Sequence, residues 1–100
     1  MSKEEPRKQR VLNQAVQVLS QIQTELELPM DEREGGISDS LLQQMQKVVL
    51  DLKAGFERNQ MPQKHLRHRV MQRMLTDSWP WGTELGKKIV ELEDLYVTLD

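Results

Sequence analysis

The hydrophobic residues of this chain recur with the spacing of amphipathic helices, most regularly between positions 37 and 56. There the apolar positions step by three and four residues, at Leu42, Met45, Val49, Leu52 and Phe56, with Leu41 and Val48 beside them. At about 100° per residue these positions share about 120° of arc, which gives one buried and one solvated face. The pattern predicts a helix over 38–58, for which either Ser38 or Ser40 can serve as N-cap.

A second stripe with the same spacing precedes it and predicts a helix over 7–27. Its positions are Leu12, Ala15, Leu19, Ile22 and Leu26. Residues 1–6 are expected to fray, because Pro6 fits only the opening turn of a helix. The matching stripes predict that the two long helices pack as an antiparallel hairpin. Seams this regular are also compatible with pairing to a second copy, so a homodimer is a hypothesis.

Two shorter helices are predicted over 62–75 and 83–97. Pro62 suits the first turn of one, whose apolar line is Leu66, Val70 and Met74, and Thr83 suits the N-cap of the other. The sequence therefore predicts an all-α fold, a bundle of four helices in which the shorter pair packs across the open side of the long hairpin. One domain over 1–100 is expected, with a core that includes Leu19, Ile22, Met45, Val49, Leu52, Val70, Leu85, Ile89 and Leu92.

The connection between the long helices is acidic and ends in Gly35-Gly36. Residues 29–37 are therefore predicted to form an exposed, mobile loop. An alternative interpretation is an acidic patch that meets a basic partner.

Composition limits the classes of function. With 37% hydrophobic and 30% charged residues the chain has a globular composition, and without cysteine it has neither disulfides nor thiolate zinc sites. No apolar run approaches the ~20 residues that span a bilayer, and the charged first ten residues do not resemble an export signal. A cytoplasmic protein that does not enter membranes is expected.

Catalytic and metal-binding patterns are weak. His65 and His68 lie three residues apart, but a zinc site needs further ligands and the chain has no third histidine. Neither a phosphate-binding glycine loop nor a nucleophile motif is present, so no enzyme activity, metal or cofactor is predicted. The acids of the last helix, Glu91, Glu93 and Asp94, are interpreted as a solvated face.

Basic residues gather on the third helix, while the last helix is acidic. Residues 57–75 carry five basic groups against Glu57, and residues 76–100 carry two lysines against six acids. A nucleic-acid-binding protein that uses this basic face is the alternative function, with a tryptophan stacking on a base. The acidic overall pI of about 5.7 and the absence of a known binding motif argue against it.

Two of the four aromatic residues flank a proline in Trp79-Pro80-Trp81, beside the basic helix. One indole is expected to close the core as a clasp, while for the other both interpretations stay open, a second buried clasp or an exposed anchor for a partner. The predicted contact surface comprises Arg67, Arg69, Arg73, Trp79 and Trp81. The predicted function is a non-enzymatic protein-interaction module, a small regulator or adaptor of the immunity- or inhibitor-protein kind. In the competing interpretation both tryptophans are buried and the arginines pair with the acids of the last helix.

Overall fold

The part of the chain that the structure describes contains four α-helices, as the sequence predicts. The computed structural model describes residues 5–58, 60, 69–80 and 82–99. The helices are α1 (Glu5–Glu27), α2 (Asp39–Glu57), α3 (Val70–Ser78) and α4 (Glu84–Thr98). Two 3-10 turns, η1 (Met30–Glu32) and η2 (Glu34–Gly36), connect α1 to α2. No strand occurs in these described ranges, so the all-α prediction is confirmed.

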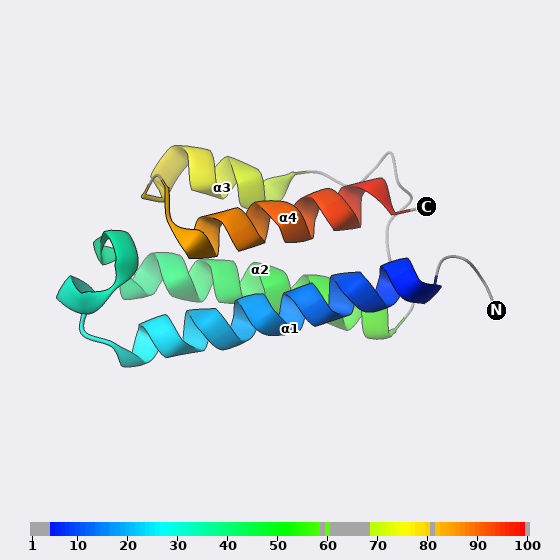
Figure 1. The fold of residues 1–100 in the computed structure, drawn as a ribbon, viewed down its shortest axis with the longest axis horizontal. Helices are drawn as coiled ribbons and strands as arrows, with labels where there is room; N and C mark the ends of the chain where they lie inside the picture. Colours follow the sequence, from blue (N-terminus) through cyan, green and yellow to red (C-terminus); the bar gives the residue numbers. More distant parts are fainter. Residues whose placement is uncertain (1–4, 59, 61–68, 81, 100) are drawn as a thin grey trace.

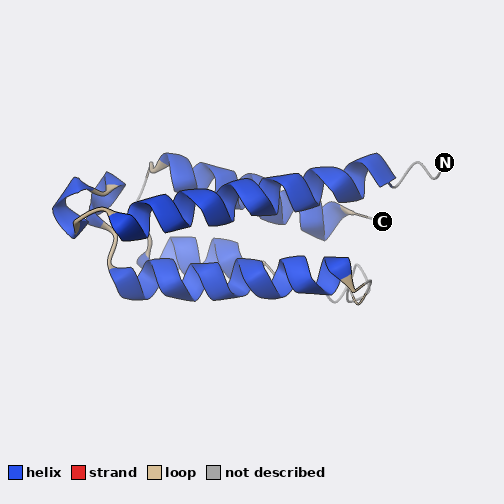
Figure 2. Ribbon diagram, turned by 90° about the horizontal axis from the view of Figure 1, so that it is seen from below, coloured by secondary structure: helices blue, strands red, loops and turns tan. Residues whose placement is uncertain are grey.

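The four helices form an up-down-up-down bundle of about 46 × 23 × 20 Å. Figures 1 and 2 show each helix antiparallel to the next, with α1 beside both α2 and α4, and α3 beside α4 and α2. The start of α1 and the end of α4 lie at the same end of the bundle (Figure 1). The predicted hairpin is thus present, and the shorter helices close its open side.

One core cluster fills the centre of the bundle. Among the predicted core residues, Ile22, Met45, Val49, Leu85, Ile89 and Leu92 are buried, while Leu19 and Leu52 are half-buried against them. The prediction for Val70 is wrong, since this side chain is 49% exposed. The described helix starts at Val70, and the next residue, Met71, faces the core instead. Half of the predicted 62–75 helix, residues 62–68, lies outside the described residues.

Side-chain caps fix the starts of two helices. Ser38 rather than Ser40 is the N-cap of α2, and its hydroxyl accepts a hydrogen bond from the Leu41 amide at 3.3 Å. Thr83 caps α4 as predicted, accepting from the Gly86 amide at 3.0 Å. Each cap satisfies an amide that the helix itself leaves without a partner.

The connection between α1 and α2 is held down by a buried arginine. Arg33 is only 7% exposed, and it forms an ion pair with Asp39 at the start of α2. Its guanidinium also donates to four main-chain oxygens, those of Glu25 (2.7 Å), Leu26 (3.3 Å), Leu28 (3.0 Å) and Ile37 (2.9 Å). These oxygens include carbonyls of the last turn of α1, which lack partners within the helix. The segment is therefore not uniformly solvated, because Arg33 and Ile37 are both buried, and its mobility stays a prediction.

The same connection contacts the turn between α3 and α4. Gly35 has φ = +72°, and a Cβ there would lie 2.6 Å from Cβ of Pro80. The Glu34 carboxylate accepts a hydrogen bond from the Glu84 amide in the first turn of α4. Only glycine fits this close approach, so the two turns form one packed end of the bundle.

Within the described parts of the chain, no helix is both long and apolar enough to cross a membrane.

Candidate functional site

The predicted contact residues lie along the edge formed by α3, α4 and the turn between them. Arg69 immediately precedes α3, Arg73 is exposed on it, and Trp79 follows its end. Arg67 and Trp81 lie outside the described residues. Arg69, Arg73 and Trp79 do not form a continuous exposed surface, because Trp79 is buried.

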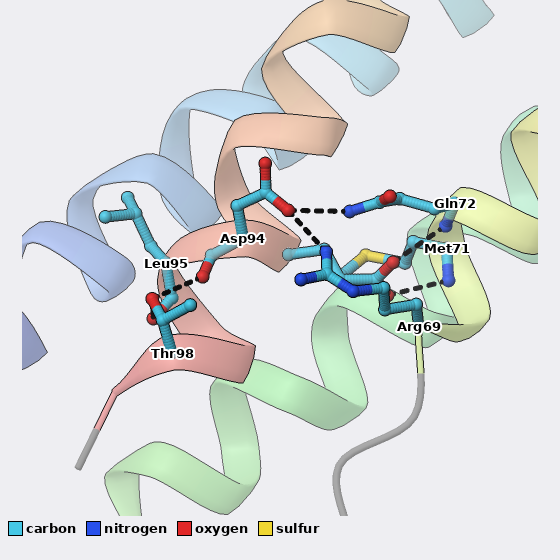
Figure 3. A network of polar contacts seen from close by, with 7 residues as sticks. Arg69, Met71, Gln72, Asp94, Leu95 and Thr98 are labelled. Carbon is cyan, nitrogen blue, oxygen red and sulfur yellow. Dashed lines mark hydrogen bonds and ion pairs between the residues drawn. The ribbon is translucent and has the colours of Figure 1, made fainter. Parts of the chain in front are cut away.

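Arg69 is paired with the acidic helix, as the competing interpretation of the sequence expects. Its guanidinium forms an ion pair with Asp94, and the Gln72 side-chain amide donates to the same Asp94 oxygen at 2.9 Å (Figure 3). The hydrogen bond from Arg69, followed by that from Gln72, lowers the pKa of Asp94 below its ordinary value. Arg69 is therefore less available to a phosphate or a partner carboxylate than the sequence suggests.

Glu93 is buried, and the interpretation of Glu93 as part of a solvated face is wrong. Only 2% of the residue is exposed, and its two carboxylate oxygens accept hydrogen bonds from the Met71 and Gln72 amides, each at 2.8 Å. These amides lie in the first turn of α3, whose N-cap Arg69 provides no side-chain cap. Glu93 thus caps α3 from the neighbouring helix, where the helix dipole also favours a negative charge.

Two opposing influences act on the Glu93 proton. Burial has the larger effect and raises the pKa of Glu93 above its ordinary value. The hydrogen bonds from the Gln72 and Met71 amides, and the charge of Arg69, act in the lowering direction. Asp94, the next residue, has its pKa shifted the other way, so adjacent carboxyls of α4 differ in proton affinity.

Trp79 is the indole that closes the core. It is 5% exposed, and its Nε1 donates to the Thr83 hydroxyl oxygen at 3.1 Å. The same oxygen accepts from the Gly86 amide, so one hydroxyl joins the indole to the start of α4. A Cβ on Gly86 would lie 2.7 Å from that oxygen and 3.6 Å from the indole ring. This crowding explains why a glycine, unfavourable in helices by about 1 kcal/mol, stands inside α4.

A groove of about 470 Å³ lies between α3 and α4, directly above this clasp. Three half-buried apolar side chains, Leu75, Pro80 and Val90, line it together with Trp79. Its polar rim is formed by Gln72, Thr76, Lys87 and Glu91. Apolar walls with a sparse polar rim are typical of binding grooves.

A larger hollow of about 730 Å³ lies between α1 and α4, but several of its polar groups contact each other or their own helix. Arg69 pairs with Asp94 there, and the Gln14 side chain donates to the Lys88 carbonyl at 3.3 Å and the Glu91 carboxylate at 3.5 Å. The Thr98 hydroxyl donates to its own helix, at the Asp94 carbonyl (Figure 3). Internally satisfied polar groups offer a ligand little, so the apolar groove is the stronger candidate.

The described residues contain no group of three or more histidine, aspartate or glutamate side chains placed to hold a metal ion. His65 and His68 fall outside the described residues. No protein-family model matches the chain, and no curated protein or solved structure is significantly similar to it.

Two charged residues that the sequence analysis did not predict to be buried, Arg33 and Glu93, stabilise local structure. Glu93 follows Ile89 by four residues and Leu92 by one, so it lies at the edge of the apolar stripe of α4. An acid at such a position is the sequence signal of a buried carboxylate. Arg33 has a weaker signal, as the only cation in the otherwise acidic stretch 25–34.

Proposed function

We propose that this protein acts by binding alone, as a small regulator or adaptor whose contact surface is the groove between α3 and α4. The observation that carries the proposal is the groove itself, in which apolar side chains from two helices and a turn line one hollow above Trp79. Burying such side chains against a partner removes apolar surface from water, which is the main favourable term in protein association.

The partner this groove fits is a protein segment that presents apolar side chains with polar neighbours. Leu75 and Val90 offer apolar contacts from opposite walls, while Thr76 and Lys87 lie on the rim. Because the rim carries both a lysine and the carboxylate of Glu91, it provides polar contacts without a dominant charge. This differs from the arginine-centred surface expected from the sequence, since Arg69 is already paired.

The packed clasp gives the groove a rigid base. Trp79 is fixed by its bond to Thr83, and the turn that carries it contacts Gly35 of the α1–α2 connection. A preformed base reduces the ordering cost of binding, which favours affinity at a small interface.

A matched pair of threonine variants tests the proposal. Thr76 lies on the groove rim and Thr98 lies outside it, and both hydroxyls donate to the carbonyl four residues earlier. We expect Thr76→Lys to place a charged chain over the groove and to reduce recovery of partners from host extract roughly tenfold. Thr98→Lys should leave recovery unchanged.

The Trp79 indole N–H resonance gives a direct readout of the groove, and a Trp81→Phe variant assigns it. A partner isolated from the extract should shift this resonance in the wild type and in Thr98→Lys, and Thr76→Lys should need roughly ten times more partner for the same shift. If Thr76→Lys binds the same partners as strongly as the wild type, the contact surface lies elsewhere, and exposed Arg73 becomes the next residue to change.

A further inference from the structure

The exposed surface of α1 carries no charge over most of its length. Arg10 and Glu25 are separated by fourteen residues, 11–24, none of which is charged. Six of them are exposed, Asn13, Val16, Gln17, Ser20, Gln23 and Thr24, and they are called the uncharged face below. At about 100° per residue they share about 120° of arc, so they form one outward strip about 17 Å long.

The contrast with α4 shows that this is not a general property of the bundle. The exposed residues of α4 are Glu84, Lys87, Glu91, Asp94 and Thr98, of which only the last is uncharged. On α1, Val16 is instead an apolar side chain with half of its surface in water. Depletion of charge around exposed apolar residues is what distinguishes the centre of a protein interface from other surface.

The strip continues across to α2. The Gln46 side chain of α2 donates to the Gln23 side chain at 3.5 Å, which places these two exposed edges together. On α2, Leu50 lies four residues beyond Gln46 and is 49% exposed. Residues four apart are neighbours on the same face of a helix. Leu50 therefore extends the apolar surface along the line where α1 and α2 meet.

Opposite charges stand at the two ends of the uncharged face. Lys8 and Arg10 precede it, whereas Glu25 and Glu27 follow it. A second α1 laid antiparallel would bring the basic end of each copy to the acidic end of the other, while a parallel one would bring like charges together. Amide side chains both donate and accept hydrogen bonds, so a face of Gln and Asn is complementary to its own copy.

We propose that the uncharged face of α1 binds a second copy of this chain, antiparallel, about a twofold axis between Gln17 and Ser20. In this register Arg10 of each copy lies near Glu27 of the other. The interface is isologous, as in most homodimers, and it leaves the groove between α3 and α4 open for a partner. The short strip puts it at the small end of specific interfaces, below about 1,200 Å² in total, so the dimer dissociates on dilution.

Sedimentation equilibrium over a range of protein concentrations tests this. The weight-average mass should rise from the 11.7 kDa of one chain toward twice that value as concentration increases. Gln17→Glu places two like charges beside the twofold axis and should raise the dimer dissociation constant roughly tenfold. Gln44→Glu, the same change at an exposed position on α2 whose amide donates to the Ser40 hydroxyl of its own helix, should leave the constant unchanged.

Charge exchange tests the antiparallel orientation. Arg10→Glu and Glu27→Arg should each weaken the dimer, and the double variant should restore it, because the pair is then reversed between copies. A single-chain mass at all concentrations overturns the proposal, as does equal weakening by Gln17→Glu and Gln44→Glu. A double variant weaker than either single one overturns the antiparallel arrangement. Circular dichroism of every variant confirms that the helices are intact.

Discussion

Replacing Glu93 with glutamine tests whether this carboxylate holds α3 in the bundle. The wild-type side chain offers two acceptor oxygens to the Met71 and Gln72 amides. A glutamine at position 93 has nearly the same shape, but it has one oxygen and an NH₂ group. It can accept one of the two amide hydrogens and must turn a donor toward the other.

The expected loss follows from the amide left without an acceptor. A buried donor without a partner costs about 1–3 kcal/mol, and the remaining bond also loses its charge assistance. Removing the charge relieves the desolvation that burial imposes on Glu93. Since these last two effects oppose each other, we expect Glu93→Gln to lower the free energy of unfolding by about 1–3 kcal/mol.

Urea denaturation followed by far-UV circular dichroism measures this loss. Glu91→Gln is the matched control, because Glu91 is exposed on the same helix and should change stability by less than about 0.5 kcal/mol. Hydrogen exchange should also become faster at the Met71 and Gln72 amides. If Glu93→Gln loses no more stability than Glu91→Gln, the carboxylate does not cap α3 and the reasoning fails.

The pH dependence of the same variants gives a second readout. The pKa of Glu93 is raised by burial, so its contribution to stability is fully present below the ordinary value of 4.5 and is lost as pH rises through the folded-state pKa. The difference in free energy of unfolding between wild type and Glu93→Gln should therefore grow as pH falls toward 4.5. The pKa of Asp94 is lowered, mainly by the hydrogen bond from Arg69. The difference in free energy of unfolding between wild type and Asp94→Asn should instead shrink as pH falls below 3.8, the ordinary pKa of an aspartate.

Three further changes test the core and the packed end of the bundle. Arg33→Gln should lower the free energy of unfolding in urea by about 2–4 kcal/mol, because the hydrogen bonds from the guanidinium to carbonyls at the end of α1 are lost. An unchanged urea midpoint would contradict this. Gly35→Ala should reduce the melting temperature more than Gly36→Ala. Both glycines have positive φ, but only a Cβ at position 35 would lie within 3.0 Å of the opposite turn. Equal losses of melting temperature would mean that the two turns are not packed together. Val49→Asp should abolish cooperative unfolding in calorimetry, whereas Val70→Asp should change the free energy of unfolding by less than about 0.5 kcal/mol. If Val49→Asp keeps the wild-type melting temperature, Val49 does not belong to the core.

Periodicity was sufficient to predict most of the core, and it failed where a helix boundary was misplaced. The apolar stripes of the long helices identified Ile22, Met45 and Val49 correctly as core residues. Residues on one buried face of a helix recur every three or four positions, so their spacing is visible in the sequence. The predicted helix over 62–75 puts Val70 near its middle and on its apolar line. In the structure Val70 is the first residue of α3 and half exposed, and the buried side chain is Met71.

The candidate site was less predictable, because its polar contacts join residues far apart in sequence. Glu93 lies 21 and 22 residues from the amides that it caps, and no local motif specifies that pairing. Arg33 binds carbonyls that only the folded turn gathers around it. The groove likewise needs α3 and α4 to be packed before Leu75 and Val90 face one hollow. Trp79, which the sequence places beside a helix break, lines this groove.

The contact between α1 and α4 has a consequence for how the chain folds during synthesis. Gln14 of α1 meets Lys88 and Glu91 of α4, at separations of 74 and 77 residues. The α1–α2 hairpin can form early from neighbouring segments, but the side of α1 that packs on α4 stays uncovered until translation has passed residue 98. A ribosome paused before α4 would hold a nascent chain with this apolar seam in water, the kind of surface that chaperones bind. Release of the last fifteen-residue helix therefore completes the bundle.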